Sequence, residues 1–315
     1  MNYAIQIRSA VDATLGIVPF TTKIVWWNTG LYPLQHRISS GAGSAKDKKA
    51  VLERNKLILD LADENDILVV GEYKDEFGLK GQLTGKNSLN KIQGKPKRLD
   101  LVNLNYQSGK RMSFHNMIVY DSSRFSWEPR SILSCTRDNV GTRKDVERYR
   151  AYQVVKFRSI EDLTFAFELF VVHWGMRDGF GGSHARQLRL RSADFLKKRT
   201  RCDNCFPYKI VVGDFNNEPF EDGLFWLEGS RSKDYVRECG GLYNPFWRYL
   251  GAEKFTMKSP RSKEFLSHGA VFDNILVNKI FLDETAGWRI TPEILEGRYD
   301  LRNCDHNPVR ITFER

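Results

Sequence analysis

The chain alternates between short apolar runs and polar segments that are rich in glycine, lysine or asparagine. Apolar runs with many Val, Ile and Phe residues are typical of β-strands buried in a sheet. We expect such strands at 23–27, 66–73, 99–104, 113–120, 151–157, 163–174, 208–215, 270–278 and 308–314. Several of them follow one another without an intervening helix, which predicts an antiparallel or mixed sheet.

Helical patterns occur between some of these strands. Ser44 is a candidate N-cap for a helix that continues to Asn65 and repeats apolar residues on one face. A second helix is expected at 184–199 and a short one at 220–228. The pattern therefore predicts an α/β fold in which helices cover the outer faces of the strands, although it does not give the strand order.

Domain boundaries are not visible in the sequence. There is no internal repeat and no interdomain linker, so we expect one domain over residues 1–315, with an N-terminal extension at 1–20. Residues 74–98 lack periodicity and are rich in Gly, Lys and Asn, which predicts a long basic surface loop.

Composition and charge narrow the class of protein. Apolar residues make up 41% of the 315 residues and charged residues 28%, which excludes a disordered chain. The formal net charge of +10 favours a polyanionic partner or an acidic membrane surface over a neutral one. Solvated surface charge is the alternative explanation. Candidate contacts to a nucleic-acid backbone are Lys95, Lys97, Arg98, Arg143, Arg177 and Arg186.

The cysteines and the N-terminal residues indicate the cellular compartment in which we expect the protein. Five cysteines form no disulfide framework, and neither a signal peptide nor a membrane span is apparent, so we expect a cytoplasmic setting. Cys202 and Cys205 have the C-x-x-C spacing of half a zinc site. Because a second local pair is missing, two ordinary thiols are the favoured interpretation.

The most informative motif is VVGDFNNEP at 211–219. An apolar strand ends there and is expected to place Asp214 and Asn216 on one side, because alternate strand residues point the same way. Asp214 could orient or deprotonate a water, and the Asn216 amide could donate to a phosphate oxygen. The alternative is a turn that caps the strand.

A second motif, CDHNPV, precedes the last strand. The Asp305 carboxylate could bind a hard cation, and the His306 imidazole could hydrogen-bond a phosphate. A solvated turn before Pro308 would show the same residues.

Four further polar residues interrupt or end apolar strands: Asn28, Glu72, His173 and Asp273. Each has an ordinary explanation in isolation, such as a turn residue, a salt bridge or a structural histidine. A carboxylate at Glu72 could bind a metal, and Asp273 could accept a hydrogen bond from an imidazole N–H.

The order of these motifs along the chain resembles the endonuclease/exonuclease/phosphatase superfamily, which has the DNase I-like fold. GDFN followed by a C-terminal Asp-His-x-Pro-Val carries the resemblance, which extends from Asn28 to Val309. It implies a four-layer α/β sandwich, with two packed mixed β-sheets flanked by helices.

The resemblance also implies roles for individual residues. Asn28 and Glu72 would hold Mg²⁺, with Asp305 close by, and Mn²⁺ could substitute. The catalytic residues implied are Asp214 for the attacking water, Asn216 and His173 for the scissile phosphate, and His306 for transition-state charge, held by Asp273.

Three positions distinguish this chain within the resemblance. Gly30 replaces an acidic residue of many DNA-repair members, Cys304 stands where Ser is commoner, and His173 resembles the DNase I and phosphatase branches. These positions make repair of abasic sites a poor match. The basic regions of the chain favour a Mg²⁺-dependent DNA endonuclease of low sequence specificity, with DNA favoured over RNA as partner. The alternatives are a hydrolase of phosphoinositide or phospholipid head groups and a non-catalytic nucleic-acid-binding module. The oligomeric state stays open.

Overall fold

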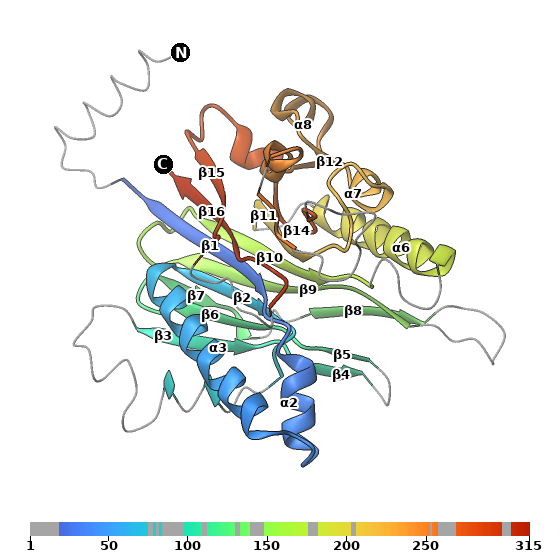
Figure 1. Cartoon of the computed structure of the whole chain (residues 1–315). Helices are drawn as coiled ribbons and strands as arrows, with labels where there is room; N and C mark the ends of the chain where they lie inside the picture. The colour runs from blue at the N-terminus through green and yellow to red at the C-terminus, as the bar shows by residue number, and fades with distance from the viewer. Residues whose placement is uncertain are drawn as a thin grey trace.

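The computed structural model describes most of the chain. The described residues are 19–74, 78–79, 82–83, 98–108, 112–129, 133–138, 148–175, 182–202, 206–252, 254–257, 269–297 and 304–315. Figure 1 shows how these residues form strands that lie between helices on either side.

The first sheet has six strands in the order β15-β16-β1-β2-β6-β3. Their bounds are β1 Thr21–Asn28, β2 Ile67–Gly71, β3 Leu99–Asn103, β6 Met117–Asp121, β15 Arg289–Ile294 and β16 Val309–Glu314. β1 pairs in parallel with β2 and antiparallel with β16, so the sheet is mixed.

The second sheet has eight strands. Seven follow the order β12-β13-β14-β11-β10-β9-β7, and β8 also pairs with β9. Their bounds are β7 Phe125–Trp127, β8 Leu133–Asp138, β9 Arg148–Ser159, β10 Ala166–His173, β11 Tyr208–Asp214, β12 Gly229–Ser230, β13 Leu242–Tyr243 and β14 Asp273–Asn278. β10 and β11 are parallel, whereas β14 runs antiparallel to β11, so this sheet is mixed as well.

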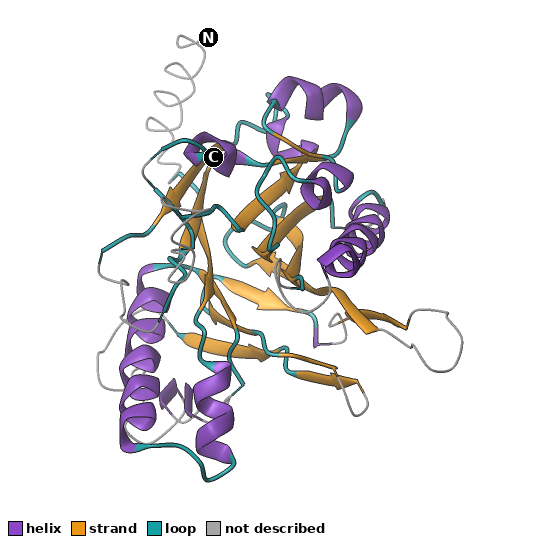
Figure 2. Ribbon diagram, turned by 45° about the vertical axis from the view of Figure 1, so that its right-hand side comes forward, coloured by secondary structure: helices purple, strands orange, loops and turns teal. Residues whose placement is uncertain are grey.

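Helices and one small hairpin complete the described structure. The α-helices are α2 Tyr32–Ser39, α3 Ala45–Glu64, α6 Gly182–Thr200, α7 Asp222–Trp226 and α8 Lys233–Cys239, and the 3₁₀ helices are η2 Pro245–Tyr249 and η3 Lys279–Leu282. The hairpin consists of β4 Tyr106–Ser108 and β5 Met112–Phe114. In Figure 2, α2 and α3 lie on one side of the strands and α6 lies on the other.

Alternation along the strands divides the apolar residues between the layers. In β1, Trp26 belongs to the core cluster shared by the two sheets, whereas Trp27 belongs to the cluster under α3. In β10, Val171 faces the shared core and Val172 packs in the cluster under α6. Because strands in both sheets are buried on two faces, they are continuous apolar runs in the sequence. The expected four-layer α/β sandwich is confirmed.

Local details follow the sequence at α3. Ser44 caps this helix: Ser44 Oγ accepts a hydrogen bond from Asp47 N at 3.1 Å, and Asp47 Oδ2 accepts one from Ser44 N at 3.0 Å. This reciprocal capping box satisfies two backbone N–H groups at the helix start.

Some expected boundaries were wrong. The strand expected at 113–120 is divided into β5 and β6, which are separated by His115 and Asn116. The strand expected at 66–73 ends at Gly71, because Glu72 has a left-handed φ of 52°. Most of the loop expected at 74–98 lies outside the described residues, as do residues 1–18 of the expected extension.

Phe20, at the end of that expected extension, exchanges backbone hydrogen bonds with Arg315 and packs edge-on against Phe165. Within the described part of the chain, no helix combines the length and apolar character needed to cross a membrane.

Candidate active site

The polar residues singled out in the sequence meet at one edge of the two packed sheets. Parallel β1 and β2 bring Asn28 opposite Gly71, next to Glu72. Parallel β10 and β11 bring His173 opposite Asp214. Because parallel strands end at the same edge of a sheet, side chains far apart in sequence converge here.

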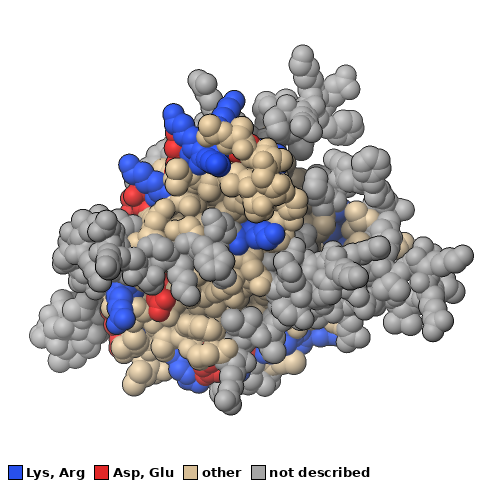
Figure 3. Space-filling view, turned by 90° about the horizontal axis from the view of Figure 1, so that it is seen from below, with Lys and Arg blue, Asp and Glu red and all other residues tan. Residues whose placement is uncertain are grey.

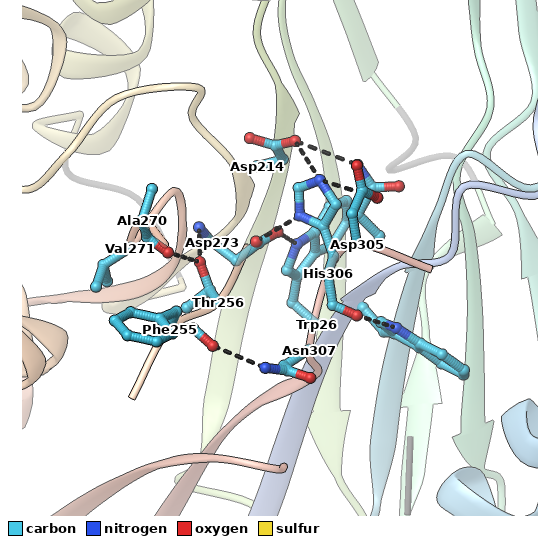
Figure 4. A network of polar contacts seen from close by, with 12 residues as sticks. Trp26, Asp214, Phe255, Thr256, Ala270, Val271, Asp273, Asp305, His306 and Asn307 are labelled. Carbon is cyan, nitrogen blue, oxygen red and sulfur yellow. Dashed lines mark hydrogen bonds and ion pairs between the residues drawn. The ribbon is translucent and has the colours of Figure 1, made fainter. Parts of the chain in front are cut away.

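Two later segments reach the same edge. Asp273 opens β14 directly opposite Asp214, and His306 lies just before β16. Figure 4 shows Asp214, Asp273, Asp305 and His306 turned toward one another between the two sheets.

Asp214 lies in the centre of this group and is only 2% exposed. Its Oδ1 accepts a hydrogen bond from Asn216 N at 2.8 Å, and its Oδ2 accepts one from Asn28 Nδ2 at 3.2 Å. Burial, reinforced by the negative charge of Asp273, raises the pKa of Asp214 to about 7. A carboxylate with such a pKa is suited to exchange a proton near neutral pH.

His306 is held by a buried carboxylate. Its Nδ1 donates to Asp273 Oδ2 at 2.7 Å, and the other oxygen of Asp273 accepts from Trp26 Nε1 at 2.7 Å (Figure 4). Burial lowers the pKa of His306, but the charge and hydrogen bond of Asp273 outweigh it and raise the pKa well above 6.5. His306 is therefore an imidazolium near neutral pH, with Nε2 3.9 Å from Asp214 Oδ2.

His173 and Glu72 lie on the other side of Asp214. His173 Nε2 is 3.6 Å from Glu72 Oε1 and 4.0 Å from Asp214 Oδ2. The Glu72 side chain is 29% exposed and that of His173 11%, so this side of the group is closer to solvent than Asp214. It is the side from which a substrate could approach.

Asn28 connects the two carboxylates. Its Nδ2 donates to Glu72 Oε1 at 3.3 Å as well as to Asp214, and its Oδ1 accepts from Gly30 N at 3.2 Å. In this arrangement the amide nitrogen, rather than the oxygen, faces the acidic group. The role of Asn28 as an oxygen ligand of a metal stays a prediction.

Hydrogen bonds within the protein also hold Asn216 in place. Its backbone has a left-handed φ of 48°, and its Nδ2 donates to Trp174 O at 2.9 Å. It is 8% exposed and follows Asp214 in a turn closed by the side chain of that residue. A contact with a phosphate would have to use the second N–H of this amide.

Asp305 is the most exposed acidic residue of the group. Its side chain is 42% exposed, and its Oδ1 is 3.9 Å from His306 Nε2. Its carboxylate is therefore accessible to an ion or a substrate from solvent.

The donor set fits a hard divalent cation. Ligand atoms of Asp214, Asp273 and His306 lie within 4.8 Å of one another. Both oxygens of Asp273, however, already accept short hydrogen bonds, and His306 Nδ1 is engaged with it. Glu72 and Asp305 carry more exposed carboxylates at this edge, with side chains 29% and 42% exposed, and oxygen donors of this kind are those Mg²⁺ prefers. Their role as metal ligands stays a prediction.

Several supporting residues had no signal in the sequence. Trp27 Nε1 donates to His306 O at 3.2 Å, and Arg54 from α3 donates through Nη1 to Thr29 O. Thr256 Oγ1 accepts from Asp273 N at 3.0 Å. Adjacent Trp residues look like ordinary core, and nothing in the helical pattern marks Arg54, so only the tertiary structure assigns these contacts.

The unusual Cys304 takes part in the same local structure. Its thiol lies 3.2 Å from His306 O and 3.6 Å from Asn28 O, and it is 9% exposed. A thiol is a weak donor but meets the same carbonyls that a hydroxyl would. Gly30 has a φ of 58°, a conformation that favours glycine over an acidic residue.

The expected nucleic-acid contacts are only partly within the described residues. Lys95, Lys97, Arg143 and Arg177 lie outside them, as does Cys205 of the C-x-x-C pair. Arg98 is exposed before β3, and Arg186 forms an ion pair with Asp222. On the face in Figure 3, Lys and Arg side chains lie in separate groups, several of them beside Asp or Glu.

The two mixed sheets, with polar residues gathered at one edge, identify the fold. The chain has the DNase I-like fold of the endonuclease/exonuclease/phosphatase superfamily. No protein-family model matches the sequence, and no curated protein matches it in a sequence search.

Solved structures carry the comparison. An endonuclease/exonuclease/phosphatase family protein from Bacteroides thetaiotaomicron is similar, with 16% identity, a TM-score of 0.56, and coverage of 94% of this chain and 96% of that chain. The human Nocturnin catalytic domain, solved with a bound sulfate anion, is also similar. It has 17% identity and a TM-score of 0.55, and the match covers 94% of this chain and 96% of that chain. Truncated TDP2 from Caenorhabditis elegans has 17% identity and a TM-score of 0.54, and the match covers 94% of this chain and 98% of that chain. At these identities the similarity establishes the fold.

Proposed function

We propose that this protein is a Mg²⁺-dependent phosphodiesterase that cleaves DNA with low sequence specificity. The observation that carries the proposal is the convergence of a buried acid, Asp214, with the Asp273–His306 pair and with His173 at one sheet edge. Such a group combines a proton acceptor with hydrogen-bond donors, which hydrolysis of a phosphate ester requires.

The proposed base is Asp214. It orients a water molecule and accepts a proton from it as the water oxygen forms a bond to phosphorus. The bond from phosphorus to the leaving oxygen then breaks, and this oxygen takes up a proton from solvent to leave as an alcohol. A pKa raised to about 7 supports this role, because such a carboxyl group can exchange a proton near neutral pH.

Charge that develops on the phosphate would be stabilised by donors. His306 offers Nε2–H while its Nδ1–H remains bound to Asp273, and its raised pKa keeps it cationic. His173 Nε2 lies 4.0 Å from Asp214 on the more exposed side, where it could contact a phosphate oxygen. His306 is held by Asp273 before the substrate binds, and such preorganisation is the condition for electrostatic stabilisation to be effective.

A divalent cation held by Glu72 and Asp305, with Asp214 and Asn28 beside it, would polarise the phosphate when bound. Without such an ion, the acidic residues oppose binding of an anionic substrate. The net charge of +10 works in the other direction over the whole surface and supports a polyanionic substrate such as DNA.

The function can be tested with purified protein and a panel of substrates. Supercoiled plasmid, single-stranded DNA, RNA and inositol phosphates would be incubated with Mg²⁺, Mn²⁺ or EDTA. We expect metal-dependent nicking of plasmid by the wild type and its loss in Asp214→Ala. Asp234→Ala is a matched control, because this carboxylate lies on α8 and is 82% exposed.

Equal plasmid cleavage by wild type and Asp214→Ala would contradict the catalytic assignment. Release of phosphate from inositol phosphates without plasmid nicking would instead establish the head-group hydrolase. Retention of DNA in a gel shift, with no cleavage under any metal, would indicate a binding module.

A further inference from the structure

An exposed aromatic side chain lies beside the proposed catalytic edge. Phe220 follows Asn216 by four residues and is 61% exposed. The described residues include only a few exposed large apolar side chains, and three of them, Phe220, Phe225 and Trp226, fall within seven consecutive positions. An aromatic ring left in water at such a place indicates an interaction site rather than a fold requirement.

Phe220 lines a pocket of about 280 Å³. We call it the Phe220 pocket; its other walls are formed by Arg186, Arg189, Asn217, Glu221 and Asp222. This volume is at the lower limit of about 300 Å³ for ligand pockets, so the space suits one small ring system.

The charged groups of the Phe220 pocket are balanced. Two arginines and two acidic residues line it, and Arg186 donates to Asp222 Oδ2 from Nε at 2.6 Å. Such a balance does not favour a phosphate in the pocket. It suits a neutral planar group that carries both donors and acceptors, as the edges of nucleobases do.

Asn217 adds a polar group to the wall of the pocket. It is 5% exposed, and its Nδ2 donates to Glu221 Oε2 at 3.2 Å. Within the described residues its carboxamide oxygen is buried and accepts no hydrogen bond, so a shift of the Asn217 side chain would be needed to offer this acceptor to a ligand in the pocket.

The Phe220 pocket is close to the catalytic edge along two chain segments. Asn217 follows Asn216 directly, and Arg189 Nη1 donates to Gly175 O, two residues after His173. Four residues span at most about 14 Å. At about 3.4 Å for each nucleotide of a strand, this distance corresponds to about four nucleotides or fewer.

We propose that the Phe220 pocket binds an unpaired nucleobase of the substrate strand, which stacks on Phe220 within a few nucleotides of the cleaved bond. The proposal rests on the proposed nuclease function and specifies its substrate. A base inside a duplex would have to leave its stack to reach Phe220, which costs free energy, whereas a base in a single strand is already accessible. Single-stranded DNA and frayed ends are therefore preferred over continuous duplex.

The experiment compares variants of the full chain with Mg²⁺ on two single strands. One is a short thymidine oligonucleotide, and the other has the same length and phosphates but abasic tetrahydrofuran residues. Phe220→Ala is expected to raise KM for the thymidine strand by about 5- to 150-fold, the range for loss of one stacked base, with kcat little changed. The abasic strand should be cleaved equally by wild type and Phe220→Ala.

Two further variants control for folding and for general surface effects. Phe225→Ala makes the same change at a ring that is 75% exposed and lies outside the pocket lining, so it should behave as wild type. Phe220→Trp keeps an aromatic face and should restore a low KM.

The outcomes separate the two proposals. Cleavage of single strands by the wild type with identical KM values for Phe220→Ala and Phe225→Ala would overturn the nucleobase pocket and leave the nuclease function standing. An equal loss on the abasic strand would also overturn the pocket, because it would not then depend on a base. Absence of nucleic-acid cleavage by the wild type with either metal would overturn the nuclease function itself.

Discussion

Replacing Asp214 with asparagine should remove the proposed catalytic base and, at the same time, stabilise the folded protein. Asp214 is 2% exposed and lies opposite Asp273, so its charged form is disfavoured in the folded state. In the unfolded chain the same carboxyl has an ordinary pKa of 3.8, whereas in the folded protein burial raises the pKa to about 7. Asparagine has a similar shape without the charge.

The magnitude follows from this difference. Each tenfold change in acidity corresponds to about 1.4 kcal/mol, so the charged form of Asp214 costs on the order of 4 kcal/mol above pH 7. Asparagine would lose one hydrogen bond, because its amide nitrogen would face Asn28 Nδ2, and this costs about 1 kcal/mol. The expected net gain in the free energy of unfolding is therefore on the order of 1–3 kcal/mol at pH 8 without metal.

Proton binding at Asp214 determines whether the free energy of unfolding rises or falls with pH. Between pH 4 and 7 the folded wild type holds more protons at Asp214 than the unfolded chain, so this group lowers stability as pH rises through that window. The advantage of Asp214→Asn should consequently be small near pH 4 and largest above pH 7. A divalent cation opposes the same repulsion, so Mg²⁺ should stabilise the wild type more than the variant.

The assay is urea unfolding in EDTA at several pH values, followed by the same series with Mg²⁺. In the EDTA series Asp305→Asn is the matched control, because this neighbouring carboxylate is 42% exposed. An Asp214→Asn variant no more stable than wild type at pH 8, or a gain independent of pH, would refute the explanation by burial. Loss of activity in the more stable variant would show that the charge is retained for function.

Three other substitutions test separate parts of the structure. Asp273→Asn keeps an acceptor for Trp26 but removes the charge that holds His306 as an imidazolium. In steady-state kinetics, kcat should therefore fall about 10²- to 10⁴-fold with KM little changed. An unchanged kcat would remove His306 from the mechanism. Glu168→Ala leaves buried Lys209 without its carboxylate, 2.7 Å away, and should cost about 3–5 kcal/mol in urea unfolding, against less than about 1 kcal/mol for exposed Glu161→Ala. Gly213→Ala would place a Cβ 2.0 Å from Val172 O, so it should separate β10 from β11 and lower the midpoint of thermal unfolding; a wild-type midpoint would contradict that close approach.

The central strands could be predicted because both of their faces are buried. β11 reads YKIVVGD and every residue in it is buried, so its apolar run stands out from the surrounding sequence. Edge strands lack this signal. β15 reads RITPEI, with exposed and buried positions mixed and a proline at Pro292, which is tolerated only because the strand lies at the sheet edge.

The candidate site was predictable only in part. Polar residues at the ends of apolar strands pointed to Asn28, Glu72, His173 and Asp214, and the structure brings all four together. Their distances depend on which strands are parallel neighbours, and sequence patterns do not determine strand order. The indole that holds Asp273 comes from β1, 247 residues away in the chain, which no local pattern can reveal.

The two interpretations of GDFN turn out to describe one structure. The turn is real: Asn216 N donates to Asp214 Oδ1, and the left-handed conformation of Asn216 sends its amide to Trp174 O. The same hydrogen bonds fix the Asp214 carboxylate with its other oxygen toward Asn28 and His306. A catalytic base needs a fixed orientation, so the turn is compatible with the role proposed for Asp214 and would support it. Asn216→Gly and Asn216→Ala both keep Asp214 and both remove the Asn216 amide, but only alanine strains the left-handed turn, so kcat should fall further in Asn216→Ala than in Asn216→Gly.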